Sequence, residues 1–444
     1  MKITIAGTGY VGLVTGICLA SIGHEITCVD TDEEKIKILQ HGKSPIYETG
    51  LLELMQKYTD KIKYTTDYIS AYTFAEVIFI GVGTPERKDG SANLSYVFEV
   101  SKHIAENLTQ DCVIAIKSTV PIGTNDKVEK FIKDSLKIPV NIDIVSNPEF
   151  LSQGTAVYDT LHASRIIIGV ESKRAAEVMK KVYDGFRQPY VLTNRRSAEM
   201  IKYASNDFLA LKISFINEIS NLCELVGADI EDVTEGMGYD PRIGNKYLKP
   251  GIGYGGSCFP KDTKALHWLS NYYDYELKTV KATIEVNENQ KIKLIKKCRK
   301  YYDSLNGRTV AILGLAFKPG TDDLREAPSL VNISIMLEDN AIIRAWDPAA
   351  IEKYKLIYPK EITYCETIEE TIKDADICFI FTEWETIKRF DINKFKELMN
   401  KPIVLDGRNC FSLRSVENAG IIYDSIGRKT IGIEHIDYID LDNL

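Results

Sequence analysis

The sequence contains few of the residues that build metal sites or disulfide frameworks. Its six histidines are scattered over 444 residues without HxxxH or HExxH spacing, and its nine cysteines, an odd number, include no CxxC pair. These patterns argue against a histidine or cysteine metal site and against a disulfide scaffold. We therefore expect reduced thiols, no metal and a cytoplasmic location.

The chain also lacks the features of proteins that bind membranes or nucleic acids. No apolar run reaches the ~18 residues of a membrane span, and the formal net charge is −8. An acidic protein is not drawn to nucleic acid or to anionic membranes, although it can still bind phosphates locally. Residues 1–6 already have the pattern of a strand, so we expect no signal peptide. What remains is a soluble protein whose hydrophobic fraction of 44% suffices for two or three domains.

Three glycines near the start of the chain form a nucleotide-binding fingerprint. Gly7, Gly9 and Gly12 give GxGxxG directly after an apolar strand, and Asp30 ends the next strand. The glycines permit a tight turn and close approach of a pyrophosphate to a helix N-terminus, whose free N–H groups favour the anion. Asp30 would accept hydrogen bonds from an adenosine ribose and repel a 2′-phosphate, which favours NAD over NADP. The alternative is a glycine turn in an α/β domain without a ligand.

Further apolar runs at 76–85, 111–123 and 140–150 predict strands that end in small or polar residues. Parallel strands deliver such ends to a ligand crevice, where Thr84 and Thr119 would lie. The simpler alternative for Thr119 is that it, or Ser118, caps the next helix.

The chain then repeats this pattern loosely. A strand with a glycine turn is predicted again at 308–320, and a strand that ends in Asp347 is predicted at 341–348. Two further strands are predicted at 374–384 and 401–409. We expect an α/β protein with two Rossmann-like doubly wound domains joined by a central helical dimerisation region. The predicted boundaries are 1–195, 196–300 and 301–444. The second half, whose glycine fingerprint is degraded, would bind a different phosphorylated ligand or none.

The stretch 197–230 predicts a long helix that ends near Gly227. Apolar residues lie nearly all round it, which is typical of a helix buried between domains or against a second subunit, so we expect a dimer. Lys202 and Asn206 are four residues apart and share one face. They either reach solvent or point into a site.

The segment GGSCFPKD places Cys258 between two glycines and a proline that can open a helix. A helix N-terminus and the nearby Lys261 would both lower the pKa of the thiol. A thiolate beside a nicotinamide site suggests oxidation at the aldehyde level through a thioester. The alternative is a buried structural cysteine.

A series of longer motifs follows in order along the chain: GTGYVG, VGTP, STVPIGT, NPEFL, SAEMIKYASNDFLALKISFINE, DPRIGNKYL, GIGYGGSCFPKD, FKPGTDDLRE and DGRN. With these motifs, the sequence resembles the UDP-glucose/GDP-mannose dehydrogenase family from residue 1 to about 430. The resemblance implies an NAD-binding domain, a central dimerisation helix and a C-terminal domain that binds the UDP part. It also implies two successive oxidations without aldehyde release, in which UDP-glucose becomes UDP-glucuronate while two NAD+ are reduced.

The resemblance assigns a role to each of a set of residues. Cys258 would be the nucleophile, Lys202 and Asn206 would stabilise the oxyanion, Asp262 and Thr119 would hold water, and Glu149 would be the acid/base. The cofactor candidates are Gly7, Gly9, Tyr10, Val11, Gly12, Asp30, Lys35, Thr84, Thr119, Gln153, Lys261 and Arg325. The substrate candidates are Glu149, Phe150, Leu151, Lys202, Asn206, Arg242, Tyr247, Leu248, Lys249, Gly251, Gly255 and Lys318, with Arg242 reaching the neighbouring subunit's substrate.

One departure from the family pattern concerns the acid/base chemistry. Family members commonly have a second glutamate where this chain has Gln153, and glutamine cannot exchange a proton at neutral pH. We therefore expect Glu149 to carry the acid/base role alone.

Three alternatives remain for the function. The first is the same reaction on another sugar nucleotide, although relatives that act on N-acetylated mannosamine nucleotides typically have GGHC and PER, and GDP-mannose enzymes have leucine in place of Phe259. The others are a non-enzymatic NAD-binding scaffold and a single-step alcohol dehydrogenase.

Overall fold

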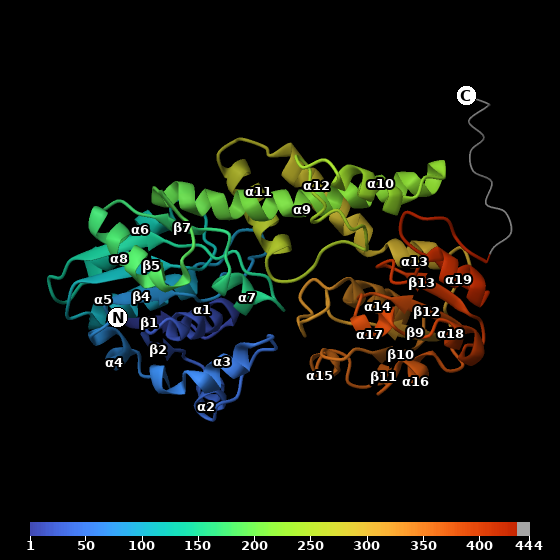
Figure 1. The fold of residues 1–444 in the computed structure, drawn as a ribbon, viewed down its shortest axis with the longest axis horizontal. Helices are drawn as coiled ribbons and strands as arrows, with labels where there is room; N and C mark the ends of the chain where they lie inside the picture. Colours follow the sequence, from blue (N-terminus) through green and yellow to red (C-terminus); the bar gives the residue numbers. More distant parts are fainter. Residues whose placement is uncertain (433–444) are drawn as a thin grey trace. The chain divides into compact units, whose positions relative to one another are not determined.

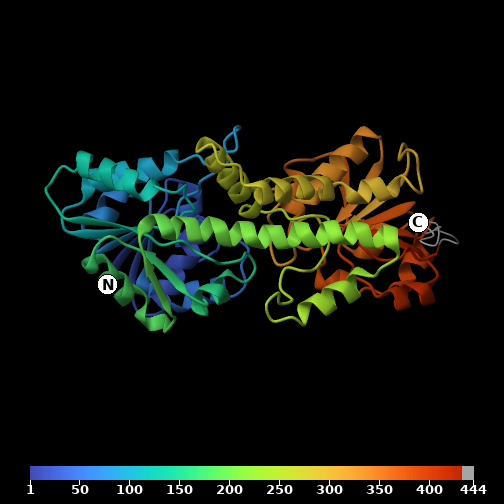
Figure 2. The same ribbon diagram turned by 90° about the horizontal axis from the view of Figure 1, so that it is seen from above.

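The computed structural model describes residues 1–432, which form two compact units. Unit 1 contains residues 1–205 and 264–275, and unit 2 contains residues 206–263 and those from 276 onward. The division falls inside two helices, α9 (Arg195–Val226) and α11 (Phe259–Tyr272). Figure 2 shows α9 as one unbroken helix.

Unit 1 is built on an eight-stranded sheet with the order β3-β2-β1-β4-β5-β6-β7-β8. All neighbouring strands are parallel except β6 and β7. The strands are β1 (Lys2–Ala6), β2 (Glu25–Val29), β3 (Ile62–Thr65), β4 (Val77–Ile80), β5 (Cys112–Ile116), β6 (Ile142–Ser146), β7 (Ile166–Gly169) and β8 (Tyr190–Thr193). The strands predicted in 76–85, 111–123 and 140–150 are therefore confirmed, and the first six strands have the dinucleotide-binding order.

Helices cover both faces of this sheet because its central strands are apolar on both sides. Every residue of β4 and β5 is buried. On one face, Ile78 and Ile114 belong to a core that includes residues of α5 and α6, whereas Val77 and Val113 belong to a core on the other face that includes residues of α8. A parallel sheet buried on both faces is what such continuous apolar runs specify. The helices of this unit before α9 are α1 (Tyr10–Ser21), α2 (Glu33–Gln40), α3 (Leu51–Lys57), α4 (Tyr68–Thr73), α5 (Ser95–Asn107), α6 (Thr124–Ser135), α7 (Ala156–Leu161) and α8 (Lys173–Tyr183).

Unit 2 repeats the topology on a six-stranded, fully parallel sheet with the order β11-β10-β9-β12-β13-β14. Figure 1 shows its strands enclosed by helices, as in unit 1. The strands are β9 (Thr309–Leu313), β10 (Ile342–Trp346), β11 (Ile362–Tyr364), β12 (Ile377–Ile380), β13 (Ile403–Asp406) and β14 (Ile422–Asp424). The prediction of a second Rossmann-like half is confirmed.

The remaining helices belong to unit 2, apart from α11. They are α10 (Ile230–Gly238), α12 (Lys278–Lys291), α13 (Lys293–Cys298), α14 (Pro328–Glu338), α15 (Ile351–Lys355), α16 (Ile368–Ile372), α17 (Glu385–Lys388), α18 (Asn393–Leu398) and α19 (Leu413–Ala419). Within residues 1–432, no helix combines the length and the apolar character needed to cross a membrane.

The long helix predicted for 197–230 is α9, which is 32 residues long. Gly227 follows it with a φ of +75°, a left-handed conformation that glycine adopts without strain. A glycine in this conformation directly after the last helical residues is a common helix stop, so the predicted end is confirmed.

Candidate active site

The glycine turn of unit 1 joins β1 to α1, and its three glycines differ in whether packing within the chain requires them. Gly7 has a φ of +94°, and a Cβ on Gly12 would lie 2.0 Å from the carbonyl oxygen of Gly7. These two glycines are required by the packing of the chain itself. A Cβ on Gly9 would meet no atom of residues 1–432 within 4 Å, although Gly9 is the N-cap of α1. The helix start, where Tyr10 and Val11 form the first turn, is thus open to an anion.

Asp30 follows β2 and faces this turn. One of its carboxylate oxygens, Oδ2, accepts hydrogen bonds from the backbone N–H and the hydroxyl of Thr8, both at 2.7 Å, and from the Lys35 ammonium at 3.3 Å. Burial disfavours the charged form, but these bonds and the Asp32 N–H outweigh it and hold the pKa of Asp30 below its ordinary value. The open helix start beside an ionised carboxylate fits an adenine dinucleotide with a free ribose hydroxyl.

The ends of β4 and β5 carry Thr84, Ser118 and Thr119. The alternative in which Ser118 or Thr119 caps the next helix is wrong, because α6 begins at Thr124 with Gly123 as its N-cap. Ser118 instead donates a hydrogen bond to the Val82 carbonyl at 2.6 Å, and Thr84 donates to the Thr119 carbonyl at 2.9 Å. The two strand ends are held together, with the Thr119 side chain only partly buried.

Glu149, which follows β6, and Lys202 of α9 form a buried ion pair. Their Nζ and Oε1 atoms are 3.0 Å apart, and the exposed fractions of the two side chains are 4% and 6%. The other Glu149 oxygen accepts a hydrogen bond from the Leu151 N–H at 2.7 Å. The ring of Phe150 lies under Lys202, with the Arg165 guanidinium 3.9 Å from its centre. Lys202 therefore points into unit 1 and not to solvent.

Gln153 lies in the turn that follows, and a second carboxylate that the sequence did not single out supports this turn. Glu48 accepts hydrogen bonds from the N–H groups of Gly154 at 2.7 Å and Ala156 at 2.8 Å, and from the Tyr10 hydroxyl. The segment after Glu149 is thus fastened to the first turn of α1. No local pattern marks Glu48, because the two backbone N–H groups that it binds are more than a hundred residues away.

Lys117 was also missed. It directly follows β5, it is buried, and its ammonium donates hydrogen bonds to the Asn147 side-chain oxygen at 3.2 Å and the Tyr183 hydroxyl at 3.4 Å. Burial lowers the pKa of Lys117 to about 8, the charge of Glu149 opposes this shift, and the charge of Lys202 adds to it. A lysine at the end of an apolar strand, as in VIAIKST, is the signal that could have found it.

In unit 2, Cys258 directly precedes α11, so the prediction that a helix opens beside Pro260 is confirmed. Cys258 is partly exposed, whereas six of the nine cysteines are buried. Asp262 lies one turn further along, and its backbone N–H donates to the Cys258 carbonyl at 2.9 Å. The Asn206 amide donates to one Asp262 oxygen at 2.7 Å, and the Lys261 ammonium contacts the other. A thiol, an amide, a carboxylate and a cation are thus gathered at one helix start.

The glycines before the thiol are needed for close packing inside unit 2. A Cβ on Gly255 would lie 2.4 Å from the Glu326 carbonyl oxygen, and one on Gly256 would lie 2.7 Å from the Phe317 ring. The thiol segment is therefore pressed against the loop 315–327, which contains Lys318 and Arg325. Arg325 pairs with Asp323, whose hydrogen bonds raise the pKa of the guanidinium, and the charge of Cys258 acts in the same direction.

The other substrate candidates of unit 2 lie in the segment before the thiol. Tyr247 has a φ of +64° and is exposed, Leu248 is buried and Lys249 is exposed. The Gly251 N–H donates to the Asn217 side chain at 2.8 Å. The Arg242 side chain is 87% exposed and pairs with Asp240 at 2.6 Å.

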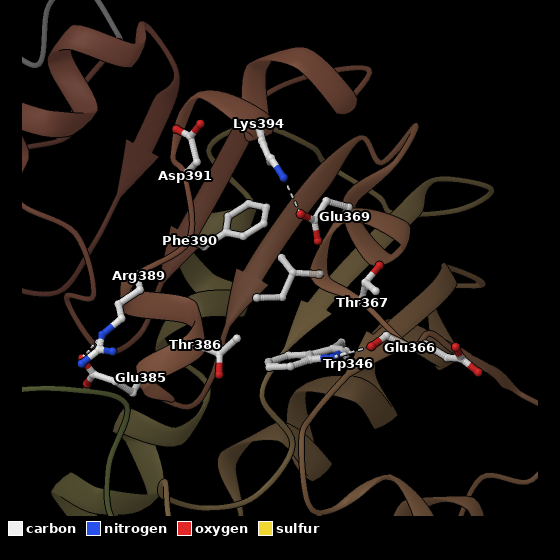
Figure 3. A pocket seen from close by; sticks show the side chains of 11 residues that line it. Trp346, Glu366, Thr367, Glu369, Glu385, Thr386, Arg389, Phe390, Asp391 and Lys394 are labelled. Carbon is white, nitrogen blue, oxygen red and sulfur yellow. Dashed lines mark hydrogen bonds and ion pairs between the residues drawn. The ribbon is translucent and has the colours of Figure 1, made fainter.

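A surface pocket of about 740 Å³ in unit 2 contains none of the predicted site residues. Figure 3 shows Trp346 and Phe390 at this pocket, with Lys394 bound to Glu369 and Arg389 bound to Glu385. Its lining residues are Trp346, Glu366, Thr367, Ile368, Glu369, Glu385, Thr386, Arg389, Phe390, Asp391 and Lys394. Four carboxylates and only two cations make it a poor phosphate site.

The glycine turn and Asp30 define unit 1 as a dinucleotide-binding domain, and unit 2 repeats its topology beside a thiol at a helix start. Comparison with known proteins leads from this class to a family. Residues 1–187, 196–289 and 311–413 match the NAD binding, central and UDP binding domains of the UDP-glucose/GDP-mannose dehydrogenase family. The chain belongs to this family and is an NAD-dependent oxidoreductase.

The similarity to individual members extends over nearly the full length. The UDP-glucose 6-dehydrogenase YwqF of Bacillus subtilis is 49% identical over 97% of this chain and 98% of its own, and the UDP-glucose 6-dehydrogenase of Rhizobium meliloti is 42% identical over 96% and 100%. Among solved structures, a UDP-glucose dehydrogenase from Pyrobaculum islandicum superposes with a TM-score of 0.90 at 33% identity, over 96% of this chain and 98% of that one.

Proposed function

We propose that this protein oxidises UDP-glucose at C6 to UDP-glucuronate in two steps at the expense of two NAD+. The observation that carries the proposal is the partly exposed Cys258 thiol at the start of α11, with Asp262 one turn away and Asn206 bound to Asp262. This arrangement occurs in a chain whose relatives at 49% and 42% identity are named UDP-glucose 6-dehydrogenases.

The cofactor would be held by unit 1. Gly7, Gly9 and Gly12 admit the pyrophosphate to the start of α1, Tyr10 and Val11 offer their N–H groups, and Asp30 accepts from the ribose. Lys35, Thr84, Thr119, Gln153, Lys261 and Arg325 complete the proposed set of cofactor contacts. NAD+, when bound, accepts hydride from C6 of the sugar in each of the two oxidations.

The protein groups carry the remaining chemistry. In the proposed mechanism the Cys258 sulfur adds to the C6 aldehyde, and the hemithioacetal loses hydride to leave a thioester. Lys202 and Asn206, on one face of α9, stabilise the oxyanion. Water held by Asp262 and Thr119 then cleaves the C–S bond, Glu149 accepts a proton from that water, and the thiol is regenerated. Overall, UDP-glucose, two NAD+ and water give UDP-glucuronate, two NADH and three protons.

The substrate would be bound by the other candidates. Lys318 would neutralise the UDP phosphates, and Gly255 would admit the sugar. Phe150, Leu151, Tyr247, Leu248, Lys249 and Gly251 would form the substrate loops. We assign this work to three domains with boundaries at 1–195, 196–300 and 301–444.

We propose a homodimer formed through α9. Five apolar side chains of this helix are 45–61% exposed, and the first three repeat every seven residues: Phe208, Phe215, Leu222, Leu225 and Val226. An apolar stripe of this spacing is stabilised when a second helix covers it. Arg242 would then reach the substrate of the neighbouring subunit. Light scattering should give twice the chain mass, and Phe215→Asp should halve it.

The location we propose is the cytoplasm. All nine cysteines are free thiols. A reducing compartment preserves such thiols, whereas an oxidising one would put the partly exposed Cys258 at risk.

The decisive experiment removes the thiol. The Cys258→Ser protein should bind UDP-glucose as the wild type does but lose NADH production, and unchanged turnover would refute the cysteine mechanism. Counting NADH per UDP-glucose consumed separates this mechanism, which gives two, from a simple alcohol dehydrogenase, which gives one. A panel of UDP- and GDP-sugars tests the alternative substrates, including N-acetylated hexosamine nucleotides and GDP-mannose.

A further inference from the structure

Asp207 is a buried carboxyl group for which the proposed mechanism gives no role. It directly follows Asn206 on α9 and is 6% exposed. Within residues 1–432, neither of its carboxyl oxygens has a hydrogen-bond partner. An ionised carboxylate in such a place is strongly disfavoured unless it is paired. Buried polar groups without partners are rare in folded proteins, so this one needs a reason.

The groups around Asp207 within unit 2 belong to the candidate site. Asp262 and Lys261 act on it from α11, and Tyr254 is affected by its charge from the segment before the thiol. The two oxygens of Asp262 are already occupied, one by the Asn206 amide at 2.7 Å and the other by the Lys261 ammonium. Asp262, 1% exposed, therefore has the donors that keep a carboxylate ionised, and Asp207 has none of them.

Two buried carboxyl groups near one cation cannot both carry a full charge cheaply. Burial is the largest influence on Asp207, and the negative charge of Asp262 comes next. Together they raise the pKa of Asp207 to about 8, against the opposing effects of its own backbone N–H group and of Lys261. The two carboxyl groups therefore differ in protonation at neutral pH: Asp207 holds a proton, whereas Asp262, with its two donors, is the anion.

We propose that Asp207 is a positioning residue that keeps a proton beside Asp262 and thereby sets the upper pH limit of the enzyme. This role rests on the proposed function. While Asp207 is protonated, Asp262 is the single anion one turn from Cys258 and retains both of its donors. When Asp207 releases its proton to solvent, a second negative charge competes for Lys261 and opposes formation of the Cys258 thiolate.

The test compares the neutral isostere Asp207→Asn with the wild type between pH 6 and pH 10. NADH formation from saturating UDP-glucose and NAD+ should fall above pH 8 in the wild type. In the variant this fall should be smaller. The ratio of kcat at pH 9.5 to kcat at pH 7 should rise by about tenfold relative to wild type, which corresponds to a shift of about one unit in the pKa that limits the rate. KM for UDP-glucose should change much less than kcat. The matched control is Asp232→Asn, the same substitution at an exposed position of α10.

A second measurement does not depend on activity. A carboxyl group whose pKa is raised by folding contributes stability that is present below its unfolded pKa and is lost as the pH rises through the folded value. The melting temperature of Asp207→Asn relative to wild type should therefore increase from pH 4 to pH 8 and level off above pH 8. Asp232→Asn should show no such trend.

The outcomes separate the two proposals. If wild-type protein does not oxidise UDP-glucose, the proposed function fails, and the melting series still decides whether Asp207 holds a proton. If Asp207→Asn keeps the wild-type alkaline fall, or if its relative melting temperature is flat with pH, the role of Asp207 is refuted. Should the asparagine variant not fold, Asp207→Ala takes its place in both series with the same expected results.

Discussion

Units 1 and 2 share one sheet order, yet their glycine turns are built for different purposes. In unit 1 the turn after β1 leads straight into α1, which begins at Tyr10. In unit 2 the corresponding Gly314 also has a positive φ, of +87°, but the next helix, α14, begins only at Pro328. A loop of thirteen residues, 315–327, stands where unit 1 has a helix start. Unit 1 can therefore offer backbone N–H groups to a phosphate, whereas unit 2 offers the side chains of that loop.

The aspartates that end the second strand of each sheet show the same divergence. Asp30 remains partly exposed and ionised beside the open helix start. Asp347 is 2% exposed, and its carboxylate accepts hydrogen bonds from four backbone N–H groups and from the Trp384 indole at 3.0 Å. Trp384 follows β12, where unit 1 has Thr84 after β4. The position that we propose for a ribose beside Asp30 in unit 1 is thus taken by a tryptophan beside Asp347 in unit 2.

This difference shows how one topology serves two ligands. A strand order fixes where the crevice lies, but the side chains at the strand ends decide what can enter it. In unit 2 the aspartate is a structural acceptor, and we propose that the loop with Lys318 and Arg325 makes the ligand contacts instead. Four experiments test the contrast, in order of decreasing expected effect.

The largest effect is expected from Gly12→Ala in unit 1. The new Cβ would lie 2.0 Å from the Gly7 carbonyl oxygen, so the turn must open. We expect a loss of about 2–3 kcal/mol of stability and a fall in NAD affinity of about 100-fold, measured by melting and by calorimetric titration. Gly9→Ala is the control, because its Cβ meets nothing within 4 Å: it should weaken NAD binding without lowering the melting temperature. Equal destabilisation by both would contradict the distinction.

Asp30→Asn and Asp347→Asn are a matched pair across the two units. Asp30→Asn should weaken NAD binding by about 10-fold, because the binding free energy of about one hydrogen bond to a charged group is lost. Because folding lowers the pKa of Asp30, its stabilising contribution is present above the unfolded pKa and is lost as the pH falls through the folded value; the variant should lose that acid sensitivity. Asp347→Asn should leave NAD affinity unchanged and cost about 2–3 kcal/mol of stability. If Asp347→Asn instead weakened NAD binding and Asp30→Asn lowered only stability, Asp347 would be the cofactor-binding residue and Asp30 the structural one.

The ends of β5 and β13, which hold the same place in the two sheet orders, also differ. Unit 1 buries Lys117 after β5, and unit 2 buries Asp406 at the end of β13. Lys117→Met should lower kcat by about 10-fold, because the cation that steadies Asn147, two residues before Glu149, is lost. Folding lowers the pKa of Lys117 from 10.5 to about 8. Between these two pH values the lysine is protonated in the unfolded chain but not in the folded one. The stability of the wild type relative to the variant should therefore rise with pH across that range. If Lys117→Met has normal kcat, and its melting temperature relative to wild type does not change with pH, then Lys117 does not support the Glu149 segment.

The smallest effect is expected from Gln153→Glu. This change restores an acid at a position where Glu149 is already proposed to act and where Glu48 already supports the turn. Turnover should stay within about tenfold of wild type, which is about 1.4 kcal/mol. A much larger gain or loss would show that Gln153, and not Glu149, decides thioester hydrolysis.

Much of the fold could be predicted from local patterns. The apolar runs that became β4, β5 and β6 and the glycines that became the turn after β1 were all visible in the sequence. The same is true of the long helix α9 with its glycine stop, and of Pro260 in the first turn of α11. These features are set by neighbouring residues, through strand hydrophobicity, helix periodicity and the backbone freedom of glycine.

The errors and omissions arose where distant segments meet. The alternative of a cap at Ser118 or Thr119 is wrong, and Ser118 instead bonds to the Val82 carbonyl, a partner on another strand end. Glu48 and Lys117 were missed because their partners lie far along the chain, and Asp207 because its burial depends on how α9 packs.

The sequence by itself determined two Rossmann-like halves, a nucleotide fingerprint and a thiol at a helix start, because each is encoded in a short stretch. Only the tertiary structure decided which charged groups are buried and with what. Among the described residues 1–432, it paired Lys202 with Glu149, gave both oxygens of Asp262 a donor and left Asp207 with none. Burial and pairing depend on residues that the fold brings together, and they set the proton affinities on which the chemistry depends.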